Sequence, residues 1–301
     1  MAEYVVIAGP SSKALAEGIA GLLGVPLVDV KEDVFPDGET RVRLVEKVSD
    51  RRCILVQSMY PPTDRHLLEG LFLARKLGLD GCEVHSVIPY LPYARQDREF
   101  IPGEVVSAKS VAYLLGAVGI RSLTTVDVHS TLAAGYFAVP MHTLSAMKAM
   151  AEFLEKNHEL TRPLVVSPDL GGSTRAEIFA QVLGASVFSL KKSRDRATGE
   201  VVVAQESVPA GGRDAVIVDD IISTGGSIVK ASMLLSGAGA RRVFAVCTHP
   251  ILAGDALRKI RDAGIFEIYG TNSVPSPVSK IDLSPLIAGH LRSLPQFSSG
   301  R

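Results

Sequence analysis

Residues 216–227 read VIVDDIISTGGS, an apolar run that passes through two acids and a turn of small residues into a helix. The apolar run predicts a buried strand, and Gly225 and Gly226 permit a tight turn before a helix that begins at Ser227. A strand joined by a short turn to a helix is the repeating unit of α/β domains with mainly parallel sheets. This stretch therefore predicts an α/β fold.

The same alternation extends along the chain on both sides of this stretch. Strand-like runs fall at 4–8, 53–57, 83–89, 123–126, 164–167, 186–190, 243–247 and 266–269, and amphipathic stretches at 11–23, 63–77, 146–156, 174 onward, 227 onward and 255–263. In the helix at 63–77 we expect Leu67, Leu68, Leu71 and Phe72 to lie on one apolar face. The alternation predicts mainly parallel sheets flanked by helices.

Length and charge bound the organisation of the chain. A chain of 301 residues exceeds the usual size of one domain, and the strand and helix pattern restarts after Pro140. We expect domains at 1–142 and 143–284, and allow for a helix at about 285–301 that packs back on the first. Lys plus Arg number 32 and Asp plus Glu also 32, so no global field would hold nucleic acid or an anionic membrane.

The cysteines and the N-terminus bear on the compartment. Cys53, Cys82 and Cys247 lie far apart, each in or beside an apolar run, with neither CxxC spacing nor an even count. Buried, inert thiols in a reducing cytoplasm are expected. The N-terminus has no basic region followed by a long apolar stretch, and no apolar run approaches the roughly 18 to 20 residues that span a bilayer. We therefore expect a cytoplasmic protein.

The small-residue turn at 223–227 has the composition of a phosphate site. Backbone N–H groups at the helix start, together with neighbouring hydroxyls, can surround a phosphate dianion. The carboxylates of Asp219 and Asp220 can accept hydrogen bonds from vicinal sugar hydroxyls. The alternative is an ordinary connection whose acids and serines only cap the helix. Two adjacent acids after an apolar strand favour the sugar-phosphate site.

Two segments of the N-terminal half suit a nucleotide. Residues 35–39 read FPDGE, and residues 93–98 read YARQDR. The ring of Phe35 can stack on adenine, and the guanidinium groups of Arg95 and Arg98 suit polyphosphate oxygens. Taken alone, residues 35–39 are better interpreted as an exposed turn, because Pro-Asp-Gly is a common turn sequence. For residues 93–98 the alternative is a solvated surface loop.

Two possible metal ligands and one cationic segment are further candidates for a functional site. His129 and Asp169 each follow a strand-like run, so both are expected at carboxyl ends of strands, where α/β proteins place ligands. Carboxylate oxygen is a natural Mg²⁺ ligand, whereas a lone histidine is more often structural. Residues 191–200 read KKSRDRATGE, which by itself would usually be a solvated loop.

These motifs together resemble a known family. Residues 219–227 resemble the signature for 5-phosphoribosyl 1-diphosphate (PRPP) shared by phosphoribosyltransferases and ribose-phosphate pyrophosphokinases. Residues 35–39 and 93–98 resemble ATP-site motifs of the pyrophosphokinases that simple transferases lack. With DVHS at 127–130 and SPDLGG at 167–172, the motifs follow the family's order along essentially the whole chain. The chain is thus similar to ribose-phosphate pyrophosphokinases, and its compact loops are more like those of archaeal members.

The resemblance implies an activity and a site. It implies two tandem phosphoribosyltransferase-type domains that transfer the β,γ-diphosphoryl group of MgATP to the C1 hydroxyl of ribose 5-phosphate, giving PRPP and AMP for nucleotide biosynthesis. It assigns ATP to Phe35, Asp37, Gly38, Glu39, Arg95, Gln96 and Asp97. It assigns ribose 5-phosphate to Arg194, Asp219, Asp220, Ser223, Thr224, Gly225, Gly226 and Ser227, and Mg²⁺ to His129 and Asp169. Lys192 and Arg194 match the family's catalytic Lys-x-Arg pair, with Lys191 as the alternative lysine.

The resemblance also implies a homo-oligomer in which residues 35–39 serve the next subunit. A dimer is the minimum, and a tetramer or hexamer is left open. Two rivals are a phosphoribosyltransferase, which would be active without ATP, and a non-catalytic regulatory homologue, which would carry damaged motifs. Ser223 replaces an Asp that many bacterial and animal members carry. This departure leaves phosphate activation and ADP inhibition open. The sequence also leaves open how strictly the protein requires ATP and which metal it prefers in the cell.

Overall fold

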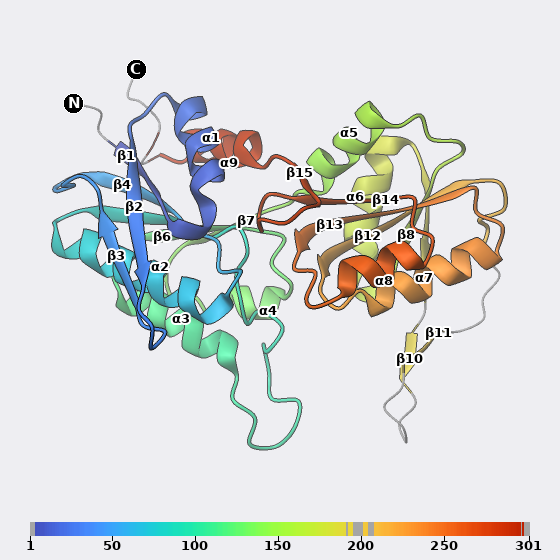
Figure 1. The fold of residues 1–301 in the computed structure, drawn as a ribbon, viewed down its shortest axis with the longest axis horizontal. Coiled ribbons are helices and arrows are strands. Elements are labelled where there is room, and N and C mark those ends of the chain that lie inside the picture. Colours follow the sequence, from blue (N-terminus) through green and yellow to red (C-terminus); the bar gives the residue numbers. More distant parts are fainter. Residues whose placement is uncertain (1–3, 191, 195–200, 204–207, 296, 298–301) are drawn as a thin grey trace. The chain divides into compact units, whose positions relative to one another are not determined.

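The computed structural model describes residues 4–190, 192–194, 201–203, 208–295 and 297. The chain divides into two compact units (Figure 1). The first unit comprises Met1–Ser145, Asn272–Pro275 and Asp282–Arg301, and the second comprises Ala146–Thr271 and Ser276–Ile281. Each unit has its own sheet and its own apolar core. Two mainly parallel sheets flanked by helices confirm the predicted α/β fold class.

The sheet of the first unit has the strand order β3-β2-β1-β4-β5-β6-β7 among the described residues. Its strands are β1 (Tyr4–Ala8), β2 (Leu27–Val34), β3 (Thr40–Leu44), β4 (Arg52–Val56), β5 (Glu83–Val87), β6 (Ser122–Val126) and β7 (Met141–Leu144). All neighbours pair parallel except β2 and β3, which form an antiparallel hairpin. Strands buried on both faces read as continuous apolar runs, as β1 does. The sequence did not predict the hairpin at the edge, because its two strands carry many charges and lack a continuous apolar run.

Helices cover both faces of this sheet. They are α1 (Lys13–Leu23), α2 (Thr63–Leu79), α3 (Ser107–Ala117), α4 (Thr131–Ala134) and α9 (Ser284–Ser293), with the 3₁₀ turn η1 (Pro10–Ser12) before α1. Figure 1 shows α1 and α9 on one side of the strands and α2 and α3 on the other. Helix α9, from the end of the chain, packs against α1 within this unit.

The expected apolar face of α2 is wrong in part. Leu67 and Leu71 are buried in the core, but Leu68 is 47% exposed and Phe72 is 48% exposed. Residues four positions apart lie on the same face of a helix, so Leu68 and Phe72 share a face, and this face lies outside the buried one. The core stripe of α2 continues instead to Ala74 and Leu77.

The sheet of the second unit has the order β15-β14-β13-β12-β8-β9 in the described part of the chain. Its strands are β8 (Leu164–Ser167), β9 (Ser186–Ser189), β12 (Asp214–Ile222), β13 (Arg242–Pro250), β14 (Glu267–Thr271) and β15 (Ser279–Ile281), and a separate antiparallel pair joins β10 (Lys192–Arg194) to β11 (Val201–Val203). Its helices are α5 (Met147–Asn157), α6 (Ser173–Leu183), α7 (Gly226–Gly237) and α8 (Ala256–Asp262), with the 3₁₀ turn η2 (Leu170–Gly172). Figure 1 shows α5 and α6 on one side of this sheet and α7 and α8 on the other.

Strand β12 is longer than its apolar run predicts. The sequence suggested that the acids follow the strand, but the ladder with β13 continues through Asp219 opposite Cys247 and Ile221 opposite His249. Because backbone pairing with β13 persists, the two acids belong to the strand itself. Cys53, Cys82 and Cys247 are buried and free of disulfides, as expected. Within the described ranges no helix is long and apolar enough to cross a membrane.

Candidate active site

The carboxyl ends of two adjacent strands bring predicted residues together in the second unit. Strands β8 and β12 pair in parallel, so Asp169, just after β8, and Asp219, near the end of β12, lie toward the same edge of the sheet. Burial, followed by the neighbouring carboxylates of Asp220 and Asp169, raises the pKa of Asp219 well above its usual value. Two further carboxyl groups, those of Asp220 and Asp169, therefore stand close enough to Asp219 to influence it.

The two acids of β12 have different surroundings, because successive side chains of a strand point to opposite faces. Asp220 is 2% exposed, and its Oδ2 lies 3.2 Å from Nη2 of Arg175 on α6. Asp219 is only half-buried, and its Oδ1 accepts a hydrogen bond from the backbone N–H of Asp220 over 2.9 Å. Asp219 is therefore the more accessible acid, and Arg175 neutralises the other.

Arg175 was not among the predicted site residues. The residue lies in the first turn of α6, directly after the SPDLGGST segment that carries Asp169. A cation in the first turn of a helix is unfavourable for the helix dipole. That misplaced charge was the available signal that Arg175 has a specific partner.

The small-residue turn links β12 to α7 in a conformation that requires glycine. Gly225 precedes α7 with φ 78°, in the left-handed region, and a Cβ there would lie 2.9 Å from side-chain carbons of Ile260. The backbone N–H groups of Leu252 and Ala253 donate to the carbonyls of Ile222 and Ser223 and support the turn from the β13 side. Thr224 and Gly226 are exposed, while Ser223 and Ser227 are half-buried. The first amides of α7 thus open toward an accessible turn.

The first unit assembles a second group of predicted residues after β5 and β6, which pair in parallel. Ser130 donates from Oγ to Oδ2 of Asp97 over 2.5 Å, and Tyr136 donates to the carbonyl oxygen of Asp97 over 2.6 Å. The Arg98 guanidinium also donates to both carboxylate oxygens of Asp97, each over 3.0 Å. Arg98 and then Ser130 lower the pKa of Asp97 to about 2. The structure therefore joins the YARQDR and DVHS motifs through a buried Asp97.

Two non-glycine residues with positive φ lie shortly before the exposed residues Arg95 and His129. Tyr93 has φ 59° and precedes Arg95, and Asp127 has φ 39° and precedes His129. Left-handed backbone at such residues carries strain and is enriched at functional sites. Arg95 and His129 are exposed and Gln96 is half-buried, so these side chains can reach a ligand, whereas Asp97 fixes the loop.

The FPDGE motif forms the tip of the β2–β3 hairpin. We call residues 35–39 the hairpin turn. The N–H of Phe35 donates to the carbonyl of Glu39 over 2.8 Å, Gly38 has φ 94°, and Asp37 accepts from the N–H of Glu39 over 3.1 Å. The Phe35 ring is 42% exposed. Among the described residues, none of the hydrogen bonds or ion pairs of the hairpin turn reaches residues 93–98.

The remaining predicted residues lie at β10. Lys192 and Arg194 pair by backbone with Val203 and Val201 of β11. Lys191 and residues 195–200 of the cationic run lie outside the described residues.

The carboxylates of Asp169 and Asp219 offer oxygen donors of the kind that bind Mg²⁺ together with a substrate. Within the described ranges no cluster of three or more His, Cys, Asp or Glu side chains could hold a metal by itself. Mg²⁺ is usually bound by one or two carboxylates together with substrate phosphates and water, so a preformed cage is not required. Burial, and after it the carboxylates of Asp220 and Asp169, raise the pKa of Asp219, and a bound cation would offset the charge of these carboxylates.

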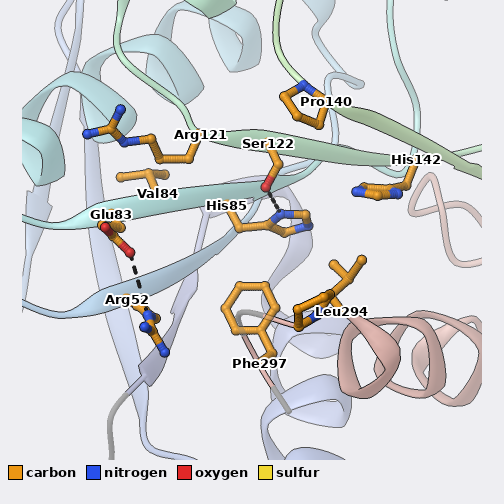
Figure 2. A pocket seen from close by; sticks show the side chains of 11 residues that line it. Arg52, Glu83, Val84, His85, Arg121, Ser122, Pro140, His142, Leu294 and Phe297 are labelled. Atoms are coloured by element: carbon orange, nitrogen blue, oxygen red, sulfur yellow. Dashed lines mark hydrogen bonds and ion pairs between the residues drawn. The ribbon is translucent and has the colours of Figure 1, made fainter.

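A separate cavity of about 560 Å³ lies at the opposite end of the first sheet (Figure 2). Arg52, Glu83 and Ser122 on its wall are the first residues of β4, β5 and β6. Figure 2 shows His85 turned to Ser122 beneath the cavity, and burial, then His142 and His290, lowers the pKa of His85 to about 3. Ligands of parallel α/β sheets bind at the carboxyl ends of strands, so this cavity is not part of the candidate active site.

Comparison with known proteins gives matches over nearly the whole chain. Residues 4–119 match the N-terminal domain of ribose phosphate pyrophosphokinase, and residues 195–295 match the phosphoribosyl synthetase-associated domain. A ribose-phosphate pyrophosphokinase of Methanothermobacter thermautotrophicus is 40% identical, covering 94% of this chain and 98% of its own. One from Sulfurisphaera tokodaii is 34% identical, covering 94% and 99%. The crystal structure of phosphoribosylpyrophosphate synthetase from Mycobacterium smegmatis superposes with a TM-score of 0.85 at 28% identity, covering 97% and 98%.

Proposed function

The chain belongs to the ribose-phosphate pyrophosphokinase family, and we propose from this premise which of its residues carry the reaction. The activity is transfer of the β,γ-diphosphoryl group of MgATP to the C1 hydroxyl of ribose 5-phosphate, which yields PRPP and AMP for nucleotide biosynthesis. The predicted family and enzyme class are thereby confirmed.

Ribose 5-phosphate is proposed to bind where β12 meets α7. The observation that supports this most is the half-buried carboxylate of Asp219 beside a turn with an accessible helix start. The amides and hydroxyls of residues 223–227 would surround the 5-phosphate, and Asp219 would accept hydrogen bonds from the ribose hydroxyls. Asp220, already paired with Arg175, takes the lesser part in holding the sugar.

ATP is proposed to bind at the exposed side chains of the first unit. Arg95 and Gln96 would contact the nucleotide, while Asp97 holds their loop through Arg98 and Ser130. The hairpin turn would supply the ring of Phe35 for the adenine and polar groups of Asp37, Gly38 and Glu39. His129 and Asp169 would hold Mg²⁺, which when bound would neutralise charge on the phosphate oxygens.

Catalysis is proposed to consist of positioning and charge neutralisation. The C1 hydroxyl oxygen attacks the β-phosphorus in line and its proton passes to solvent. The bond from this phosphorus to the bridging oxygen breaks, and AMP leaves with that oxygen. Lys192 and Arg194 would close on the phosphate oxygens as charge develops, and Arg194 would also contact ribose 5-phosphate. We assign no general base to the protein.

The cellular setting is part of the same proposal. We propose a cytoplasmic homo-oligomer, at least a dimer, in which the hairpin turn of one subunit completes the ATP site of the next. The buried free cysteines accord with a reducing compartment. An exposed Phe35 accords with a turn that contacts another subunit.

The test of the activity is ³¹P NMR of the purified protein with MgATP and ribose 5-phosphate. Signals of AMP and PRPP are expected together, and neither should appear when ribose 5-phosphate is omitted. Formation of ADP would mean simple phosphoryl transfer, and absence of any reaction would favour a regulatory homologue.

The site assignment is tested by Asp219→Asn. This variant should raise the KM for ribose 5-phosphate much more than the KM for ATP, because the amide of asparagine replaces one of the two acceptor oxygens that face the sugar hydroxyls by a donor. Equal changes in both constants would contradict the placement of the sugar.

A further inference from the structure

A buried carboxylate ties the β2–β3 hairpin to helix α2. Glu69 of α2 is 0% exposed. Thr40, the residue that directly follows the hairpin turn, donates from Oγ1 to Oε1 of Glu69 over 2.6 Å. A buried acceptor that is ionised makes a hydrogen bond stronger than a neutral one. The base of the hairpin turn is therefore fixed to a helix of the core.

The second oxygen of Glu69 is held just as firmly. Oε2 of Glu69 lies 2.7 Å from Nδ1 of His66, and Nε2 of His66 lies 2.6 Å from the carbonyl oxygen of Pro61. A carbonyl cannot donate, so Nε2 carries a proton and His66 is locked between two acceptors. Burial alone raises the pKa of Glu69, but the hydrogen bonds from His66 and Thr40 bring this pKa below its usual value. The carboxylate therefore stays ionised and its direction is fixed.

The other strand of the hairpin joins the same group. Glu32 of β2 lies 3.2 Å from Nε of Arg65, and that nitrogen lies 3.7 Å from Oε1 of Glu69. Both strands of the hairpin thus meet α2 through one set of two acids and two bases. Burying charges costs free energy unless they are paired and hydrogen-bonded. Oε1 of Glu32 and Nε of Arg65 are within ion-pair distance but make no hydrogen bond among the described residues. The hydrogen-bonded part of the anchor is therefore Glu69 with Thr40 and His66.

The hairpin turn leaves the two strands at the point where this anchor acts. Its own hydrogen bonds, from Phe35 to Glu39 and from Gly38 to Phe35, keep its shape but do not attach it to the core. In the hairpin register Val34 pairs with Thr40, so the Thr40 hydroxyl acts at the point where the turn leaves the strands.

We propose that Glu69 is a positioning residue for nucleotide binding, acting through the hydroxyl of Thr40 to hold the hairpin turn in place. The inference rests on the proposed function, in which this turn contacts ATP. Neither Glu69 nor Thr40 touches substrate in this proposal. Their loss should therefore change the KM for ATP and leave the handling of ribose 5-phosphate intact.

The test compares Thr40→Val with Thr40→Ser. Valine keeps the shape of threonine without the donor, and serine keeps the donor. Thr40→Val should raise the KM for ATP about tenfold, the loss expected for one hydrogen bond to a charged group. The kcat and the KM for ribose 5-phosphate should stay within about twofold, and Thr40→Ser should restore wild-type behaviour. Amide hydrogen exchange at residues 35–39 should rise in Thr40→Val alone.

Glu69→Gln and the double variant extend the test. Glu69→Gln should raise the KM for ATP at least as much as Thr40→Val, and the double variant should be no worse than Glu69→Gln, because both changes break one path. Glu69→Gln also disturbs a buried charge pair and can unfold the chain, so the Thr40 pair decides the outcome. Two outcomes would overturn the proposal. One is the same KM for ATP in Thr40→Val and Thr40→Ser, and the other is a rise in the KM for ribose 5-phosphate as large as the rise in the KM for ATP.

Phe35→Ala separates this proposal from the function on which it rests. A higher KM for ATP in Phe35→Ala without any effect of Thr40→Val overturns only the positioning role of Glu69. An unchanged KM for ATP in Phe35→Ala removes the role of the hairpin turn, and the positioning role falls with it. The activity measured by ³¹P NMR stands in either case.

Discussion

The contrast between Asp219 and Asp220 leads to a prediction at the scale of single residues. Arg175 supplies the ion pair of the buried Asp220, and removal of one partner from a buried pair costs about 3 kcal/mol or more. Arg175→Gln should therefore lower the free energy of unfolding by about 3 kcal/mol in urea titrations. Arg258→Gln is the control, because its pair with Asp255 is exposed and screened by solvent, so its loss should change the free energy of unfolding little. Equal effects of the two variants would contradict the role of Arg175.

The Lys-x-Arg pair allows a kinetic prediction. Lys192→Ala should reduce kcat by roughly a hundredfold to a thousandfold, the effect of losing one charge contact made in the transition state. Binding of ribose 5-phosphate, measured by calorimetry, should change little. Lys191→Ala is the matched control and should keep most of the turnover. Near-normal turnover in Lys192→Ala, with a loss in Lys191→Ala, would assign the catalytic role to Lys191.

His85 predicts a dependence of stability on pH. Burial, then His142 and His290, lowers its folded-state pKa to about 3 from an ordinary 6.5. The unfolded chain binds the proton more readily, so this contribution to stability is complete above pH 6.5 and is lost as pH falls toward 3. Between pH 6.5 and 5 the wild type should lose about 1 to 2 kcal/mol more than His85→Gln, whose amide does not titrate. If wild type and His85→Gln lose the same free energy of unfolding between pH 6.5 and 5 in urea titrations, the role of His85 is refuted.

At the scale of elements, the crossing of α1 and α9 depends on a glycine. A Cβ on Gly18 would lie 2.3 Å from Oγ and 2.9 Å from Cβ of the buried Ser284. Gly18→Ala should therefore lower the free energy of unfolding by about 1 to 3 kcal/mol through overpacking. Gly21→Ala on the same helix meets nothing within 4 Å and should stabilise by up to about 1 kcal/mol through helix propensity. Thermal unfolding of both variants checks the opposite signs.

The amino-acid sequence predicts some strands of this protein better than others. The strands β1, β4 and β8 were visible because both faces of each are buried and the apolar run is continuous. The hairpin strand β2 carries charges on an edge and gave no such signal. The end of β12 was misplaced because pairing with β13, not side-chain polarity, decides where a strand stops.

At the scale of the whole molecule, the two units should respond to different substrates. Ribose 5-phosphate alone should slow amide hydrogen exchange at residues 223–229 of the second unit, since the phosphate would cover the start of α7. An unreactive ATP analogue with Mg²⁺ should slow exchange at residues 93–98 of the first unit. Mass spectrometry of peptides from both segments checks this, and protection of residues 93–98 by ribose 5-phosphate alone would contradict the assignment.

The sequence by itself determined the α/β class, the order of the motifs and the family, because apolar runs, glycines and charges within a few residues of one another report local structure. Only the tertiary structure decided which partners these residues have. Asp97 meets Ser130 across 33 positions, and Asp220 meets Arg175 from another element. A buried polar group must be paired, but the topology of the chain decides which side chain is near enough to pair with it.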